Sequence, residues 1–139
     1  MKPLERYPQC FVCGDQNPAG LNVSFYLKDG KVVAEYTAEP QFQGYQDILH
    51  GGILSALLDE VMIRAVLARR ISCLTIEINV RFKKMVKIGD KLSLEGSMTG
   101  EKGKLYLAEG RITNQDGETV AEGTGKFIRA DGETEKLLS

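Results

Sequence analysis

Tryptophan is absent from this 139-residue chain, histidine occurs once, and cysteine occurs three times. One histidine is too little for a histidine-based catalytic triad or for a metal site. Three cysteines form no disulfide framework, so we expect a reduced, cytoplasmic protein. Charge of one sign is not in excess either, because 18 basic residues meet 19 acidic ones. This balance argues against a nucleic-acid-binding protein and against a polybasic membrane protein.

Long apolar runs are also missing. No stretch approaches the roughly 20 residues of a membrane span, and the N-terminal sequence MKPLERYPQC lacks the apolar region of a signal peptide. There is no repeat and no low-complexity segment. We therefore expect one domain over residues 1–139, long enough for a real hydrophobic core. Its N-terminal segment, residues 1–20, is expected to be irregular, and its polar tail, residues 131–139, to be loose.

The most informative segment follows a His-Gly-Gly turn at residues 50–52. A helix over about residues 51–69 would carry apolar side chains on every side, so other structure must surround it. Asp59 and Glu60 lie in its middle, and a carboxylate is costly to bury unless it is paired, hydrogen-bonded or used. The turn leaves backbone N–H groups free at the positive end of the helix dipole, which suits a carbonyl oxygen gaining negative charge. Oxyanion donors and an acid on one buried helix indicate acyl chemistry.

Segments of alternating polarity, bounded by turns, predict six strands around this helix. They cover residues 21–27, 31–37, 74–83, 92–99, 105–113 and 118–128, and the last four are expected to form an antiparallel meander. We expect the face that carries Glu77, Asn79 and Arg81 to meet solvent or another subunit. Small residues on one face of the last two strands would let a helix lie close to the sheet: Ala108, Gly110, Ala121, Gly123 and Gly125. These features predict an α+β fold in which a curved antiparallel sheet wraps around one long central helix.

These motifs resemble the hotdog-fold acyl-CoA thioesterases, in the branch similar to phenylacetyl-CoA thioesterase, over about residues 10–128. The most specific part is the His-Gly-Gly turn with Asp59 nine residues after the histidine, followed by Leu-Thr-Ile-Glu-Ile-Asn at 74–79. Cys-Phe-Val-Cys-Gly at 10–14 and Asn-Pro-Ala-Gly-Leu at 17–21 also resemble the start of such chains. The resemblance implies a hotdog fold, hydrolysis of an acyl-CoA thioester without a cofactor or metal, and a homodimer or dimer of dimers.

The resemblance also implies roles for residues of the helix. The Gly51 N–H is expected to point at the thioester carbonyl, with Gly52 beside the substrate, although paired glycines also simply permit a tight turn. Asp59 is expected to carry the chemistry, as a nucleophile that forms an anhydride-like intermediate or as a general base on water. The alternative is a buried Asp59 paired with Arg64 or with a neighbouring hydroxyl. Glu60, the fallback catalytic candidate, is expected to form an ion pair at the surface or at an interface.

Supporting roles fall to residues outside the helix. His50, the sole histidine, is expected to orient the loop or to donate to the carbonyl region. Thr75 lies where the family has a Ser or Thr whose hydroxyl could hold Asp59 or the attacking water, although threonine is common in strands. In relatives a loop amide ahead of the histidine helps to fix the carboxylate or carbonyl, and Gln43 is a better candidate for it than Gln46.

A basic cluster near the end of the strand 74–83 consists of Arg81, Lys83, Lys84 and Lys87. The phosphates of CoA would suit these cations. Lysines that protect a solvated strand edge are the more frequent explanation.

Two cysteines near the N-terminus, Cys10 and Cys13, are spaced like half a zinc site. A structural zinc ion needs four ligands, and only Cys73 and His50 remain among cysteines and histidines. We therefore interpret the pair as local packing, ahead of a zinc site completed by the two cysteines of a second chain and of a reversible redox pair.

The spacing of Gly51 and Asp59 leads to a prediction about assembly. Eight residues separate them, which is about 12 Å along a straight helix, so both cannot touch one carbonyl. A site that uses both must take one from a second chain whose helix runs antiparallel. We therefore predict an obligate two-fold dimer with two equivalent sites at its interface.

Two other functions are alternatives to hydrolysis. A hotdog domain that only binds acyl-CoA or a related ligand is compatible with the fold alone, but Gly51 and Asp59 together favour an enzyme. Hydration or dehydration of an acyl thioester is less well supported, because Gly-Asp-Gln-Asn-Pro at 14–18 lacks the histidine that should follow the proline. Aromatic, short-chain and medium-chain acyl groups all stay open.

Overall fold

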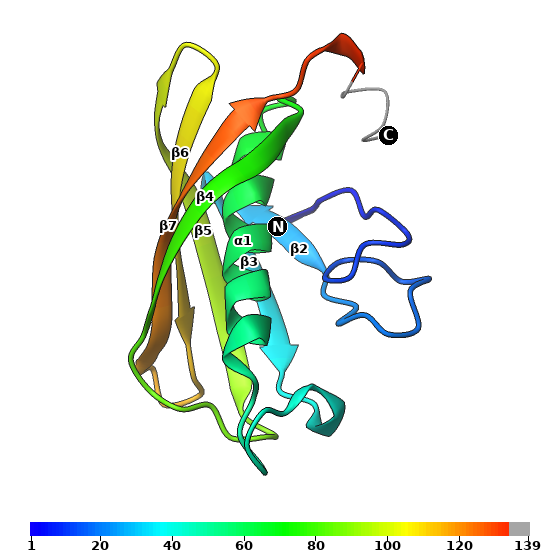
Figure 1. Cartoon of the computed structure of the whole chain (residues 1–139), viewed down its shortest axis with the longest axis vertical. Coiled ribbons are helices and arrows are strands. Elements are labelled where there is room, and N and C mark those ends of the chain that lie inside the picture. The colour runs from blue at the N-terminus through cyan, green and yellow to red at the C-terminus, as the bar shows by residue number, and fades with distance from the viewer. Residues whose placement is uncertain (134–139) are drawn as a thin grey trace.

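One long helix lies across a curved antiparallel sheet in the computed structural model, which describes residues 1–133 (Figure 1). The part of the expected tail from residue 134 on lies outside the described residues. The helices are α1 (Gly51–Leu67) and a short 3₁₀ turn, η1 (Pro40–Phe42). The strands are β1 (Lys2–Pro3), β2 (Phe25–Lys28), β3 (Lys31–Thr37), β4 (Cys73–Phe82), β5 (Lys91–Lys102), β6 (Leu105–Thr113) and β7 (Thr119–Arg129). Within residues 1–133, no helix is long and apolar enough to span a membrane.

The helix α1 begins where the sequence predicts and ends two residues earlier, at Leu67. His50 has extended backbone angles and caps the first turn, because its Nδ1 accepts a hydrogen bond from the Gly52 N–H at 2.8 Å. Arg70, with φ 63°, closes the last turn in a left-handed conformation that a helix cannot continue. Eight of the 17 residues of α1 are buried, and most of the others are half-buried, as expected of a helix that other structure surrounds. The buried residues are Leu54, Leu57, Leu58, Val61, Met62, Arg64, Ala65 and Val66.

A row of glycines lets the helix approach the sheet. Gly96 of β5 pairs with Gly110 of β6, which pairs with Gly123 of β7, so three neighbouring strands lack a side chain at the same level. A Cβ atom at Gly96 would collide with the Val61 carbonyl of α1, and one at Gly110 would press on the Met62 side chain at 3.1 Å. The small-residue face predicted on β6 and β7 is therefore confirmed, and it extends onto β5.

The expected meander of the last four strands is wrong in one respect. The sheet order is β1-β2-β3-β5-β6-β7-β4, so β4 pairs with β7 at the far edge and not with β5. The reason lies in the connection from β4 to β5. The Ala38 N–H donates to the Asp90 carbonyl and the Gly89 N–H to the Ala38 carbonyl, at 2.9 and 2.8 Å. These bonds place the start of β5 beside β3, so β4 is left at the opposite edge.

The N-terminal part also departs from the prediction. The expected strand over residues 21–27 begins only at Phe25, because the N–H groups of Leu21 and Val23 donate to the carbonyls of Phe11 and Val12. Residues 1–20 are not wholly irregular, since β1 adds a short strand to β2. The N-terminal segment therefore packs as a layer beside α1, as Figure 1 shows.

A curved antiparallel sheet around one central helix is the hotdog fold. The expected fold class is confirmed, and the corrections concern the order of strands in the sheet and the N-terminal part.

Candidate functional site

The half-buried carboxylate of Asp59 lies in the middle of α1 and faces β4. Its Oδ1 accepts a hydrogen bond from the Thr75 hydroxyl at 2.7 Å. Burial raises the pKa of Asp59, the hydrogen bond from Thr75 lowers it, and the neighbouring charge of Glu60 raises it. The net effect is a pKa above the ordinary value of an aspartate. A carboxylate with a raised pKa is a stronger base, when ionised, than one in water.

A β-bulge puts Thr75 on the helix side of the sheet. Strict alternation along β4 would place Thr75 on the same face as Glu77, away from Asp59. The register with β7 shifts between Thr75 and Glu77, so Ile76 is an extra residue. Thr75 is half-buried as a result, whereas Ile76 is 54% exposed. The bulge therefore makes the Asp59–Thr75 contact possible.

The apolar residues of β4 differ in how far they are buried. Ile78 and Val80 are half-buried beyond the bulge, whereas Leu74 and Phe82 are 40% and 55% exposed. Because β4 has one neighbour in the sheet, these side chains lie along a free strand edge.

The start of α1 offers a free backbone donor. Within residues 1–133, no group accepts a hydrogen bond from the Gly51 N–H, whereas the Gly52 N–H is taken by His50 Nδ1. Because Nδ1 is an acceptor, a neutral His50 carries its proton on Nε2 and can donate from there. An N–H at the positive end of a helix dipole suits an oxygen that gains negative charge.

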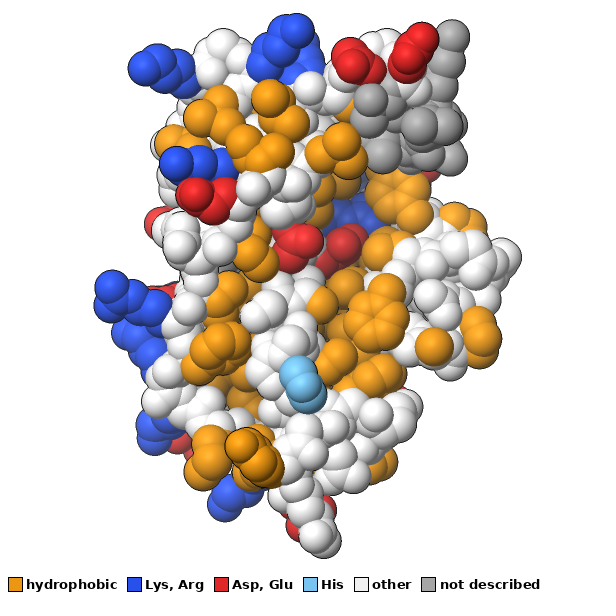
Figure 2. Space-filling view, viewed as in Figure 1, with side chains coloured by type: hydrophobic (Ala, Val, Ile, Leu, Met, Phe, Trp, Pro, Cys, Tyr) orange, Lys and Arg blue, Asp and Glu red, His pale blue; other side chains and the backbone are white. Residues whose placement is uncertain are grey.

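A hollow of about 840 Å³ opens beside this helix start. Its lining includes His50, Gly51, Leu54, Phe82, Lys83 and Lys84. Figure 2 shows the histidine in pale blue on one face of the molecule, with acidic side chains higher on the same face that are bordered by hydrophobic ones.

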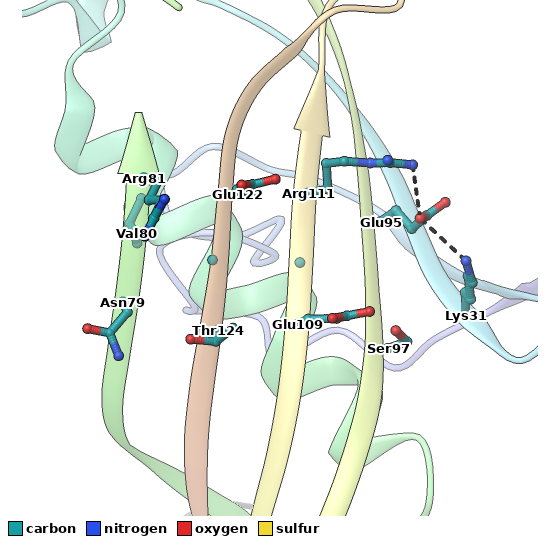
Figure 3. Close-up of a pocket in the computed structure, with 12 residues that line it drawn as sticks. Lys31, Asn79, Val80, Arg81, Glu95, Ser97, Glu109, Arg111, Glu122 and Thr124 are labelled. Carbon is teal, nitrogen blue, oxygen red and sulfur yellow. Dashed lines mark hydrogen bonds and ion pairs between the residues drawn. The ribbon is translucent and has the colours of Figure 1, made fainter. Parts of the chain in front are cut away.

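The basic cluster predicted around residues 81–87 borders two surfaces. Lys83 and Lys84 border the hollow and are paired with Glu122 (3.0 Å) and Glu118. Arg81 lies on the outer face of the sheet, among the charged side chains in Figure 3. Glu122 lies on that face too, so Lys83 reaches from the rim of the hollow to the side of the sheet that carries Arg81.

The side-chain amide of Gln43 forms a hydrogen bond within its own loop. Its Oε1 accepts the Asp47 N–H at 2.8 Å, and its side chain borders the hollow without contacting Asp59. Gly51 and Asp59, eight residues apart on one straight helix, are likewise not brought together within one chain.

The neighbour of Asp59, Glu60, forms an ion pair as expected, but within the chain this pair is largely buried and does not lie at the surface. Its Oε2 accepts from Arg64 Nε at 2.9 Å, and the two side chains are only 15% and 3% exposed. Arg64, which was one expected alternative partner of Asp59, is thus held by Glu60. It also stacks on the Tyr7 ring at 4.9 Å and donates to the Glu5 carbonyl. This buried Arg64 is the central link between α1 and the N-terminal segment, a role that the apolar pattern of the helix does not reveal.

Comparison with known proteins identifies the family. Residues 46–121, more than half of the chain, match the family model of the thioesterase superfamily. The chain belongs to the thioesterase superfamily. The matched region runs from the loop before α1 to β7, so it contains Gly51, Asp59 and Thr75.

Two curated relatives match by sequence. The mouse acyl-coenzyme A thioesterase THEM5 is 27% identical over 109 residues, which are 77% of this chain and 44% of that protein. The L-carnitine dehydrogenase/betainyl-CoA thioesterase of Agrobacterium fabrum (strain C58) is 29% identical over 132 residues, which are 83% of this chain and 27% of that protein. The chain therefore spans less than half the length of either relative.

Solved structures match the fold over most of the chain. A thioesterase superfamily protein aligns with a TM-score of 0.81 and 25% identity, covering 87% of this chain and 60% of that one. A hypothetical thioesterase of Streptococcus pneumoniae, solved with coenzyme A, has a TM-score of 0.74 and 24% identity over 78% and 86% of the two chains. The PaaI protein of E. coli, from the phenylacetic acid degradation operon, has a TM-score of 0.71 and 23% identity, covering 81% of this chain and 82% of that one. The two last likenesses concern the fold alone.

Proposed function

We propose that this protein hydrolyses an acyl-CoA thioester to the free acid and CoA. The observation that carries the proposal is the half-buried Asp59 carboxylate held by Thr75 on the same helix that presents the free Gly51 N–H. Membership of the thioesterase superfamily supports the reaction class. That one fold neighbour was solved with coenzyme A and another with acetyl-CoA supports the class of ligand.

In the proposed reaction, the Gly51 N–H donates to the thioester oxygen as the carbonyl carbon becomes tetrahedral. Asp59 either attacks that carbon or removes a proton from a water that attacks it. The Thr75 hydroxyl fixes the carboxylate, so that its other oxygen, Oδ2, is directed at the substrate or water. His50 Nε2 donates beside Gly51, near the same carbonyl.

The two halves of the site belong to different subunits in this proposal. About 12 Å along α1 separates Gly51 from Asp59, so a second chain with an antiparallel helix must supply one of them. The surface for that chain is the free edge of β4, where Leu74, Ile76 and Phe82 are exposed beside the face of α1 that carries Asp59. A dimer formed there holds two equivalent sites, and a dimer of dimers is a further possibility.

The CoA end of the substrate would lie at the rim of the hollow. Lys83 and Lys84 are its nearest cations, and their ion pairs with exposed glutamates are weak enough for phosphates to replace. Arg81, on the outer face of the sheet, reaches CoA only if it belongs to the other subunit.

The test is thiol release from phenylacetyl-, benzoyl-, butyryl-, octanoyl- and palmitoyl-CoA, with Asp59→Asn beside the wild type. Asp116→Asn is the matched control, since it removes one carboxylate in the exposed turn between β6 and β7. Hydrolysis that requires Asp59 and not Asp116 supports the proposal and identifies the acyl group. A folded dimer that binds CoA but releases no thiol from any substrate supports the alternative, a ligand-binding domain without catalysis.

A further inference from the structure

A tight turn at the N-terminus presents two thiols side by side. The Cys13 N–H donates to Cys10 Sγ at 3.4 Å, and the Gly14 N–H donates to the Cys10 carbonyl at 2.9 Å. A Cβ atom at Gly14 would collide with the backbone of Pro8 and Cys10, so only glycine permits this approach. Backbone N–H donation to a sulfur stabilises its thiolate form, and the turn fixes the direction of both sulfurs.

A carboxylate from α1 completes the group. Glu60 Oε1 lies 3.8 Å from Cys10 Sγ, and one oxygen of Glu60 and the two sulfurs all lie within 4.8 Å of one another. The other oxygen of Glu60 is held by Arg64 Nε at 2.9 Å, and Arg64 Nη2 lies 2.6 Å from Cys13 Sγ. Arg64 thus fixes the orientation of Glu60 and Cys13 through hydrogen bonds, as neighbours of metal ligands commonly do.

We propose that Cys10, Cys13 and Glu60 bind a divalent transition-metal ion of the zinc class, with water as the fourth ligand. Bond lengths of about 2.3 Å to sulfur and 2.1 Å to oxygen in a tetrahedron place two sulfurs roughly 3.8 Å apart and a sulfur and an oxygen roughly 3.6 Å apart. The Cys10 Sγ–Glu60 Oε1 distance of 3.8 Å lies close to the second value. The other two pairs lie within 4.8 Å, so side-chain rotations would bring the three ligand atoms around one ion. Glu60 supplies the third ligand that a search among cysteines and histidines misses.

The charges of the group also fit a divalent ion. Two thiolates, one carboxylate, the Arg64 guanidinium and a divalent cation sum to zero, which matters because Cys13 and Arg64 are buried. A cysteine binds a metal ion as its thiolate, so binding displaces any proton that a thiol carries.

Such an ion would join the N-terminal segment to the middle of α1, one residue from Asp59. The metal ion would take no part in the proposed reaction, because no step of that reaction uses Glu60 or the cysteines. The metal site therefore stands or falls independently of the thioesterase proposal.

The test is titration of the reduced, full-length protein with Co²⁺, followed by displacement with Zn²⁺. We expect one ion per chain, an absorption band from thiolate-to-cobalt charge transfer, and loss of that band when zinc replaces cobalt. Cys10→Ser and Glu60→Gln should lose the stoichiometric ion, and Cys10→Ser should also weaken the band. Cys73→Ala is the matched control, because Cys73 is the third cysteine and lies outside the group; it should bind as the wild type does.

Three outcomes would overturn the site. The first is that reduced, folded wild type shows no charge-transfer band at any cobalt concentration that saturates a simple dithiol. The second is that Cys10→Ser binds cobalt as tightly as the wild type and with the same spectrum. The third is that thiol counting finds Cys10 and Cys13 joined as a disulfide in the purified protein, with no metal bound after reduction. Circular dichroism of each variant distinguishes a lost ligand from a lost fold.

Discussion

Replacing Gly51 by proline removes the proposed oxyanion donor and leaves the helix in place. Proline has no N–H, and its ring is well tolerated at the first position of a helix, which Gly51 occupies. The residue before a proline must be extended, and His50 already has φ −62° and ψ 134°. A Cβ atom at Gly51 meets only the Phe82 ring at 3.6 Å, an ordinary contact. The change therefore deletes one hydrogen-bond donor with little structural cost.

The expected effect follows from the contribution of one such donor to transition-state stabilisation. Losing an oxyanion donor typically costs about 2.7–4 kcal/mol of transition-state stabilisation, or about 10²–10³ in kcat. The assay is steady-state thiol release from the best acyl-CoA of the panel. Gly51→Ala is the matched control, because alanine adds the same Cβ and keeps the N–H. If Gly51→Pro retains the activity of Gly51→Ala, the Gly51 N–H is no oxyanion donor.

The same variant tests whether each site is shared between subunits. In a heterodimer of Gly51→Pro and Asp59→Asn chains, one site carries both substitutions and the other carries neither. Random pairing of the two variants gives about half heterodimers, so about a quarter of the wild-type activity should return on mixing. A mixture that exchanges subunits but stays inactive would place both groups of a site in one chain and refute the geometric reasoning.

Three further predictions concern the surroundings of the site. Thr75→Val removes the hydrogen bond that lowers the pKa of Asp59, so the acid limb of kcat/KM should move to higher pH, whereas Thr75→Ser should keep the wild-type profile. Gly96→Ala should reduce the free energy of unfolding in urea by about 1–3 kcal/mol, because its Cβ collides with α1; Gly100→Ala, which has only a 3.7 Å contact, should change it little. Ile76→Lys should yield folded monomers in sedimentation, whereas Thr124→Lys on the outer face should leave the dimer intact.

Much of the fold could be predicted because its signals are local or periodic. The apolar helix, the alternation along each strand and the small residues on β6 and β7 are all readable in the sequence. The order of the strands could not be predicted, because it depends on hydrogen bonds between Ala38 and the turn at Gly89-Asp90. These residues lie far apart along the chain. A glycine turn before a strand indicates a change of direction, but it does not say beside which strand the chain returns.

The candidate site, too, could be predicted from the sequence only in part. Gly51 and Asp59 are identified by their places on one helix, and the hydrogen bond from Thr75 was anticipated as one possibility from family resemblance. Alternation alone would have put Thr75 on the wrong face, since the sequence carries no plain mark of the bulge at Ile76. The Glu60–Arg64 pair was missed because charged residues on a helix usually face water, and only the N-terminal segment that covers Arg64 reverses that expectation.

The strand β4 links the proposed chemistry to the proposed assembly. Its bulge turns Thr75 toward Asp59 and, in the same step, turns Ile76 outward beside Leu74 at the free edge of the sheet. One irregularity thus positions the carboxylate and adds apolar surface for a second chain. That chain is needed, because Gly51 lies about 12 Å along the helix from Asp59. Dilution that dissociates the dimer should therefore abolish hydrolysis even if each monomer stays folded, since no single chain brings the donor and the carboxylate to one carbonyl.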